Sequence, residues 1–204
     1  RPSQPLTAER IATLPRTQQA AWKQYLETSQ RSMQADKDNL KAEQKAAGAA
    51  VAPAAEHSGN ARSIPLNKEA AWYATPEALH IAAVVLSFQT PAGGWSKNLD
   101  MAHTPRLPGQ SYASGPDATA SLATPGDFGR VSDTHWGYIG TIDNDATITQ
   151  IHYLAKIVTA LGPGSPAAAL YRKSVLRGIY YLLAAQYPNG GWPQINPLAG
   201  GYHG

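Results

Sequence analysis

One seven-residue pattern occurs twice in this chain of 204 residues, ninety-seven positions apart. The copies are Gln89-Thr-Pro-Ala-Gly-Gly-Trp95 and Gln186-Tyr-Pro-Asn-Gly-Gly-Trp192, and both fit Gln-x-x-x-Gly-x-Trp. Each copy follows an apolar stretch that is typical of a helix. The glycine pair permits positive φ angles and close backbone approach, and the tryptophan supplies a flat apolar side chain. The repetition favours helical hairpins joined by similar loops around a ring with a central groove.

The spacing of apolar residues predicts helices over residues 20–47, 76–89, 141–161 and 166–186. The first of these is mostly polar and amphipathic. In the last, the residues expected to face inward are Leu170, Val175, Ile179, Leu182 and Leu183. No segment shows the sustained alternation of a half-buried strand. The sequence therefore predicts an all-α fold of antiparallel helical hairpins joined at one end by long loops.

Composition narrows the classes of partner. The net charge is +3, but residues 71–204 hold seven basic and seven acidic side chains, so the folded part is neutral. A nucleic-acid binder would concentrate positive charge there. There is no cysteine, which excludes disulfides and thiolate chemistry. No apolar run approaches the roughly 18 residues that span a bilayer. We expect neither nucleic acid nor membrane as a partner.

The segment Thr141-Ile-Asp-Asn-Asp-Ala-Thr147 holds an oxygen-rich cluster. Asp143, Asn144 and Asp145 offer the carboxylate and amide oxygens that a hard cation such as calcium prefers. Asp and Asn at the start of a helix also cap its free N–H groups and complement its dipole. Both interpretations remain open on the residues alone.

Aromatic and polar residues follow each glycine pair. Lys97 and Asn98 come just after Trp95, a combination that suits a sugar ring stacked on the indole with its carboxylate against the ammonium. The alternative is that Trp95 fills the core and Lys97 is solvated. The same two interpretations apply to Trp192, and His203 is either a ligand or acid–base group or simply exposed. His152 is expected to be a core or groove residue.

Three strings in order resemble the pectate lyases of polysaccharide lyase family 10. They lie within residues 89–101, 140–156 and 178–203, and they include Gly-Gly-Trp-Ser-Lys-Asn, Thr-Ile-Asp-Asn-Asp-Ala-Thr and Gln-Tyr-Pro-Asn-Gly-Gly-Trp-Pro-Gln. The resemblance covers residues 66–204 as a partial catalytic module. Residues 1–65 are expected to form an N-terminal helix and an Ala/Pro-rich linker.

The resemblance implies an (α/α) toroid that cleaves polygalacturonate by β-elimination with Ca²⁺. By motif position Asp143 would be a calcium ligand and catalytic residue, with Asn144 and Asp145 at the same metal site. The substrate-binding candidates are Trp95, Lys97, Asn98, Trp192 and His203. The resemblance also implies an arginine base and a further acidic ligand on helices that follow these motifs. We expect a secreted or periplasmic monomer that acts on pectin, and the chain to be the N-terminal portion of its catalytic module.

Two other functions fit parts of the pattern. One is a uronate-binding fragment without turnover, which has the aromatic side chains and Lys97 but no base. The other is a different helical-toroid enzyme, such as a terpene cyclase or a sugar hydrolase. The low aromatic content, 8%, argues against the deep aromatic cavity of a terpene cyclase.

Overall fold

The computed structural model describes residues 6–48, 64–113 and 140–198. Its helices are α1 (Ala8–Ala12), α2 (Arg16–Ala47), η2 (Ala70–Ala74), α3 (Pro76–Ser87), α5 (Ile148–Leu161), η3 (Pro166–Ala168) and α6 (Ala169–Ala185). The strands β1 (Gly140–Thr141) and β2 (Ile195–Asn196) form one short antiparallel pair. The predicted all-α class is confirmed. A closed toroid stays a prediction.

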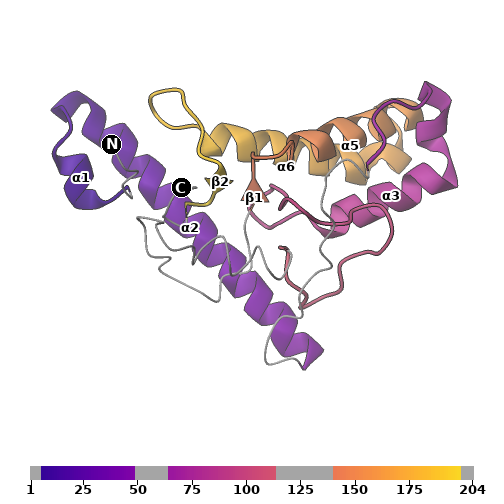
Figure 1. Ribbon diagram of the computed structural model, residues 1–204, viewed down its shortest axis with the longest axis horizontal. Coiled ribbons are helices and arrows are strands. Elements are labelled where there is room, and N and C mark those ends of the chain that lie inside the picture. Colours follow the sequence, from indigo (N-terminus) through magenta and orange to yellow (C-terminus); the bar gives the residue numbers. More distant parts are fainter. Residues whose placement is uncertain (1–5, 49–63, 114–139, 199–204) are drawn as a thin grey trace.

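The core lies where η2, α3 and α5 meet (Figure 1). Helix α3 begins where Thr75 accepts a hydrogen bond from the Ala78 N–H and proline occupies the first helical position. The buried alanines of this helix, Ala78 and Ala82, let large aromatic rings of other segments approach its backbone. The Tyr153 hydroxyl on α5 donates to the Ala78 carbonyl at 2.9 Å, and the buried Trp95 indole N–H donates to the Val85 carbonyl at 2.7 Å. The rings thus bury apolar area without leaving a polar atom unpaired.

Helices α5 and α6 form the predicted hairpin, turning at Gly162, where φ is +85°. The predicted inward face of α6 is wrong in three of its five positions. Leu170, Ile179 and Leu183 are 61%, 40% and 61% exposed. The buried positions are instead Ser174, Gly178, Tyr181 and Ala185. Small residues are needed there because the loop around Trp95 lies directly against the helix: a Cβ on Gly178 would come within 3.0 Å of the indole ring.

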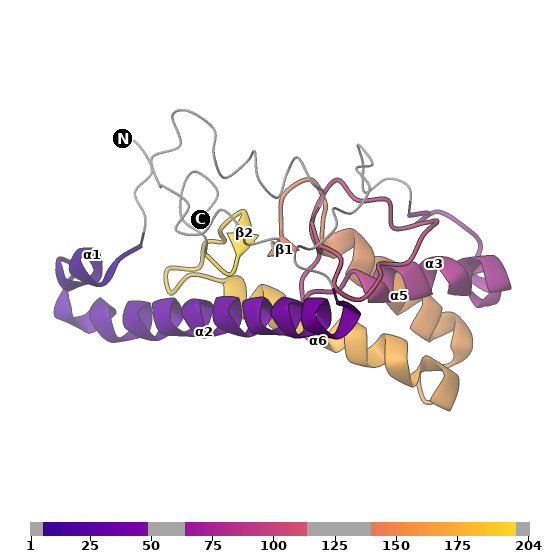
Figure 2. The ribbon, with the colours of Figure 1, turned by 90° about the horizontal axis from the view of Figure 1, so that it is seen from below.

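Helix α2 is one long rod that passes the C-terminal end of α6 and then diverges from it (Figures 1 and 2). It extends the predicted helix by one turn at its start. Its buried positions, Tyr25, Ser29, Asp36 and Leu40, recur at spacings of four and seven, and two of them, Ser29 and Asp36, are polar. The Tyr25 hydroxyl donates to the Ala185 carbonyl at 3.1 Å, which ties the rod to the end of α6. Within the three described ranges, no helix is long and apolar enough to cross a membrane.

Helix α5 begins at Ile148, seven residues later than predicted. The preceding residues Asn144, Asp145 and Thr147 have φ angles of +53°, +61° and +65°, which a right-handed helix cannot contain. The segment before α5 is therefore a tight turn, and this turn carries the acidic cluster.

Candidate functional site

The three sequence motifs meet at the short β1–β2 pair. Thr141 pairs with Ile195 across the strands, and the Ile142 N–H donates to the Gln194 carbonyl at 2.8 Å. On its other side the Thr141 N–H donates to the Trp95 carbonyl at 2.9 Å. The acidic turn therefore emerges between the two repeated loops.

Both repeated loops close through the same hydrogen bonds. The glutamine side chain donates to the carbonyl four residues on, from Gln89 to Gly93 at 2.8 Å and from Gln186 to Gly190 at 3.0 Å. Each tryptophan indole donates to the carbonyl ten residues earlier, at 2.7 Å in the first loop and 2.9 Å in the second. Gly93 and Gly190 have φ angles of +107° and +90°, where a Cβ is disfavoured. The pattern Gln-x-x-x-Gly-x-Trp thus encodes one loop structure used twice.

The first loop is held from two sides by buried polar groups. From α6, the Arg177 guanidinium donates to the Thr90 and Pro91 carbonyls at 2.8 and 3.1 Å. From α2, the Asp36 carboxylate accepts the Ala92 N–H at 2.9 Å. Asp36 is fully buried, and burial raises its pKa to about 7. This bracing positions the residues that follow Trp95.

Thr147 joins the first loop to the acidic turn. Its buried hydroxyl donates to the Thr141 carbonyl at 2.7 Å and accepts the Trp95 N–H at 3.0 Å. Its positive φ is costly for a β-branched residue, on the order of 1–3 kcal/mol, and persists because these contacts hold it. These two hydrogen bonds therefore fix the backbone of the turn that carries Asp143 and Asp145.

An ion pair between described residues lies at this junction. The Lys97 ammonium and the Asp143 carboxylate are 2.6 Å apart, and their side chains are 23% and 29% exposed. Solvent and a ligand can therefore reach both groups. The pair brings together the first and second motifs, which are 46 residues apart in the sequence.

The acidic side chains do not cap α5. Thr147, at the cap position, makes no side-chain capping bond, and the Ile148 and Thr149 N–H groups donate to the backbone carbonyls of Ala146 and Asp145. Asn144 and Asp145 are exposed. Among the described residues, no group of three His, Asp or Glu side chains is arranged to hold a metal ion.

A family model described as pectic acid lyase matches residues 89–204, more than half of the chain and all three motifs. The chain belongs to the pectic acid lyase family. This confirms the family resemblance of the motifs. Among solved structures, this pectic acid lyase family member is similar to a point mutant of a family 10 polysaccharide lyase from Cellvibrio cellulosa in complex with trigalacturonic acid.

That likeness has 29% sequence identity and a TM-score of 0.42, and it covers 70% of this chain and 35% of the other. The pectic acid lyase family member therefore spans about a third of the length of that enzyme. A comparison with curated proteins found no significant match.

The two tryptophans of this pectic acid lyase family member differ in how far their side chains are exposed. Trp95 is fully buried, so its ring has no face to offer a sugar, and the core alternative holds. Trp192 is 50% exposed and can still present a ring. Asn98 follows Lys97 with a φ of +60° and is half-buried. His203 lies outside the described residues.

Sequence reasoning missed the residues that brace this site. Thr147 is the last residue of the segment that begins at Thr141, and the threonine at each end of this segment was an available signal. Arg177 and Asp36 gave no such signal. Both lie on helices whose other charged residues are mostly exposed, and the pairing to the loop appears only in three dimensions.

Proposed function

We propose that the chain is part of a pectate lyase that binds polygalacturonate beside Lys97 and Asp143 and cleaves it by calcium-assisted β-elimination. The observation that carries this proposal is the convergence of all three family motifs on one accessible ammonium–carboxylate pair. We place the protein outside the cytoplasm, secreted or periplasmic, where the polymer is.

The reaction removes the proton at C5 of a galacturonate unit. The electron pair forms the C4–C5 double bond, and the C4–O4 bond breaks so that the leaving oxygen takes a proton. The neighbouring carboxylate resists the negative charge that develops on proton removal. A positive group against that carboxylate stabilises the enolate-like transition state.

Lys97 is the group of this chain that suits that role. Its ammonium can donate to the uronate carboxylate through a short charge-assisted hydrogen bond. Asp143 holds Lys97 in place before substrate binds, since the two form the ion pair described above. Because the pair is only partly buried, the substrate can reach it without a large rearrangement.

The acidic turn offers the kind of oxygen ligands that calcium prefers, but too few of them to complete its coordination. Asp143, Asn144 and Asp145 provide hard oxygen donors on one rigid turn. Calcium takes six to eight oxygens, so substrate carboxylates, water or other protein groups must supply the rest. When bound, the ion would neutralise the uronate carboxylate and so acidify the C5 proton.

The reaction also needs a base that takes the C5 proton. The resemblance implies an arginine. Arg177 is bound to the Thr90 and Pro91 carbonyls, and Arg106 pairs with Glu43 and stacks on the Tyr112 ring at 3.4 Å. Both are committed to the fold, so we expect the base outside the described ranges.

The test is product formation from polygalacturonate by the whole chain, followed by the ultraviolet absorbance of the unsaturated product. We expect activity with calcium, loss with chelator, and a fall of about a hundredfold or more in Asp143→Asn. Asp100→Asn is the matched control, because it removes the same charge from a carboxylate that pairs with His103. Equal rates with and without chelator would rule out the calcium step.

Calcium binding has its own readout. An ion that binds only the folded chain raises the unfolding temperature in proportion to the logarithm of its concentration. We expect this shift in the unaltered chain and in Asp100→Asn, and none in Asp143→Asn. Uronate binding without product would instead support the non-catalytic uronate-binding alternative.

A further inference from the structure

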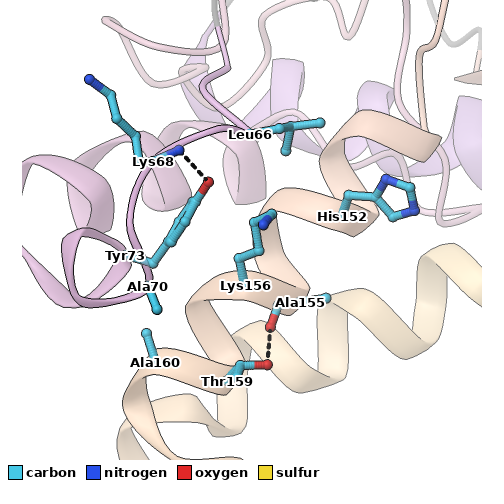
Figure 3. Close-up of a pocket in the computed structure, with 9 residues that line it drawn as sticks. All are labelled: Leu66, Lys68, Ala70, Tyr73, His152, Ala155, Lys156, Thr159 and Ala160. Atoms are coloured by element: carbon cyan, nitrogen blue, oxygen red, sulfur yellow. Dashed lines mark hydrogen bonds between the residues drawn. The ribbon is translucent and has the colours of Figure 1, made fainter.

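A hollow lies away from the Lys97–Asp143 pair, between η2 and the side of α5 (Figure 3). Its volume is about 700 Å³, within the range of small-molecule sites. Its apolar lining consists of Leu66 and the small side chains of Ala70, Ala155 and Ala160. It can accept a flat ring with an apolar face.

Two lysines and a histidine are among the polar residues that line this pocket. Lys68 comes from the segment before η2, and His152 and Lys156 come from α5. His152 and Lys156 are four residues apart, so they share one face of the helix. No Asp or Glu is among the residues that line the pocket. A neutral ligand would make no use of this arrangement.

Aromatic rings hold the two ammonium groups. The Lys156 Nζ lies 5.1 Å from the centroid of the Tyr73 ring, and the Lys68 Nζ lies 5.5 Å from that of Trp72. Neither lysine forms an ion pair with a carboxylate in the described part of the chain. A cation held over a ring keeps its donors available for an anion. Lys156 therefore offers a positive charge beside the apolar lining, whereas the Lys68 side chain extends away from the other lining residues (Figure 3).

We propose that this pocket is a second uronate site that binds the carboxylate of a galacturonate unit. The sugar ring would lie on the apolar lining and its carboxylate would meet Lys156 and His152. The identity of the sugar rests on the proposed function. The binding of an acidic ring rests on the pocket alone.

The second site is separate from the first, although the first lies just before α5 and the second lies on α5. Asp143 precedes the start of α5, whereas Lys156 lies eight residues beyond Ile148, roughly 12 Å along the helix at 1.5 Å per residue. Two sites on one rigid helix can hold two units of one polymer, and the second contact then forms at high effective concentration. The pocket would thus retain the polymer while the first site acts on it.

The test measures trigalacturonate binding to the whole chain by calorimetry. Lys156→Met keeps an unbranched side chain over Tyr73 but removes the charge, and we expect about two- to fivefold weaker binding. Lys173→Met is the control, since Lys173 is an exposed lysine of α6 outside the pocket. Equal dissociation constants for Lys156→Met and Lys173→Met would overturn the proposal.

Nuclear magnetic resonance separates the two sites. We expect the ring signals of His152 to move when trigalacturonate is added, also in Asp143→Asn, and to stay in place with the fully methyl-esterified trisaccharide. Ring signals that stay unmoved at saturating trigalacturonate would contradict the second site.

The two proposals can fail separately. Binding that depends on Lys156 without any product would refute only the proposed function. Product formation with binding that is indifferent to Lys156 would refute only the second site. No binding of trigalacturonate at all would overturn the second site.

Discussion

Individual polar residues, more than large apolar ones, determine where the Lys97–Asp143 pair lies. Thr147 links Trp95 to Thr141, and Asp36 anchors the loop before Trp95 through the Ala92 N–H. Leaving such a buried group unpaired costs about 1–3 kcal/mol, so each contact strongly favours one arrangement of the loops.

Asp36 should make stability depend on pH. Burial raises its pKa to about 7, because the charged form is poorly solvated; the hydrogen bond from the Ala92 N–H and the nearby Arg177 only partly offset this. A raised carboxyl pKa means that the folded chain binds more protons than the unfolded chain. The free energy of unfolding therefore falls as pH rises from about 4 to about 7.

We expect Asp36→Asn to flatten this dependence, because the amide keeps the acceptor for Ala92 and cannot ionise. Asp38→Asn is the control, since Asp38 is exposed on the same helix. Urea unfolding across this pH range measures both variants. A slope unchanged in Asp36→Asn would show that another group titrates.

At the residue scale, sequence could single out Lys97 and Asp143 because they lie in short, unusual strings. It could not decide the state of Trp95, since a tryptophan after two glycines serves equally as a core residue or a sugar platform. Asp36 was beyond prediction because its partner, Ala92, is 56 residues away and contributes only a backbone N–H.

At the element scale, the two repeated loops have the same internal bonds but different surroundings. Gln89 is buried, and besides closing its loop it donates to the Ser174 carbonyl at 3.0 Å and accepts from the Ser174 hydroxyl at 2.7 Å. The bond from Gln186 to Gly190 is exposed. Helix α6 covers the first loop but leaves Trp192 half exposed beside the second.

This difference predicts unequal effects of one substitution. Gln89→Leu should lower the free energy of unfolding by about 1–3 kcal/mol, because buried partners lose their bonds. Gln186→Leu should lower it by less than about 1 kcal/mol, because water replaces the lost bond. Denaturant unfolding of the two variants gives the comparison directly. A larger loss for Gln186→Leu would mean that the second loop is covered by groups outside the described residues.

The positions of the helices could be predicted, but not which of their faces are buried. Apolar periodicity located α3, α5 and α6 to within a turn at most ends, since long periodic segments carry the strongest signal. The inward face of α6 was wrong because close contact with the Trp95 loop requires Gly178 and Ser174, which no hydrophobicity pattern favours. The start of α5 was missed because positive φ angles at Asn144 and Thr147 are not encoded by residue type alone.

At the scale of the whole molecule, one side of α6 remains apolar and exposed. The residues that form this apolar face are Leu176, Ile179, Tyr180 and Leu183. A further helical hairpin, which the toroid hypothesis requires, would cover it as α6 covers the first loop. Exposed apolar patches of this kind favour association when no partner element is present.

The chain should therefore self-associate as its concentration rises, despite the expectation of a monomer. Ile179→Lys combined with Leu183→Lys should lower the apparent mass in sedimentation and leave the unfolding temperature nearly unchanged, because neither side chain is part of the core. Leu107→Lys is the matched control: Leu107 is 66% exposed but lies in the loop after α3, away from this face. The control should associate like the unaltered chain. A monodisperse, cooperatively unfolding monomer at high concentration would show that the apolar face does not drive association.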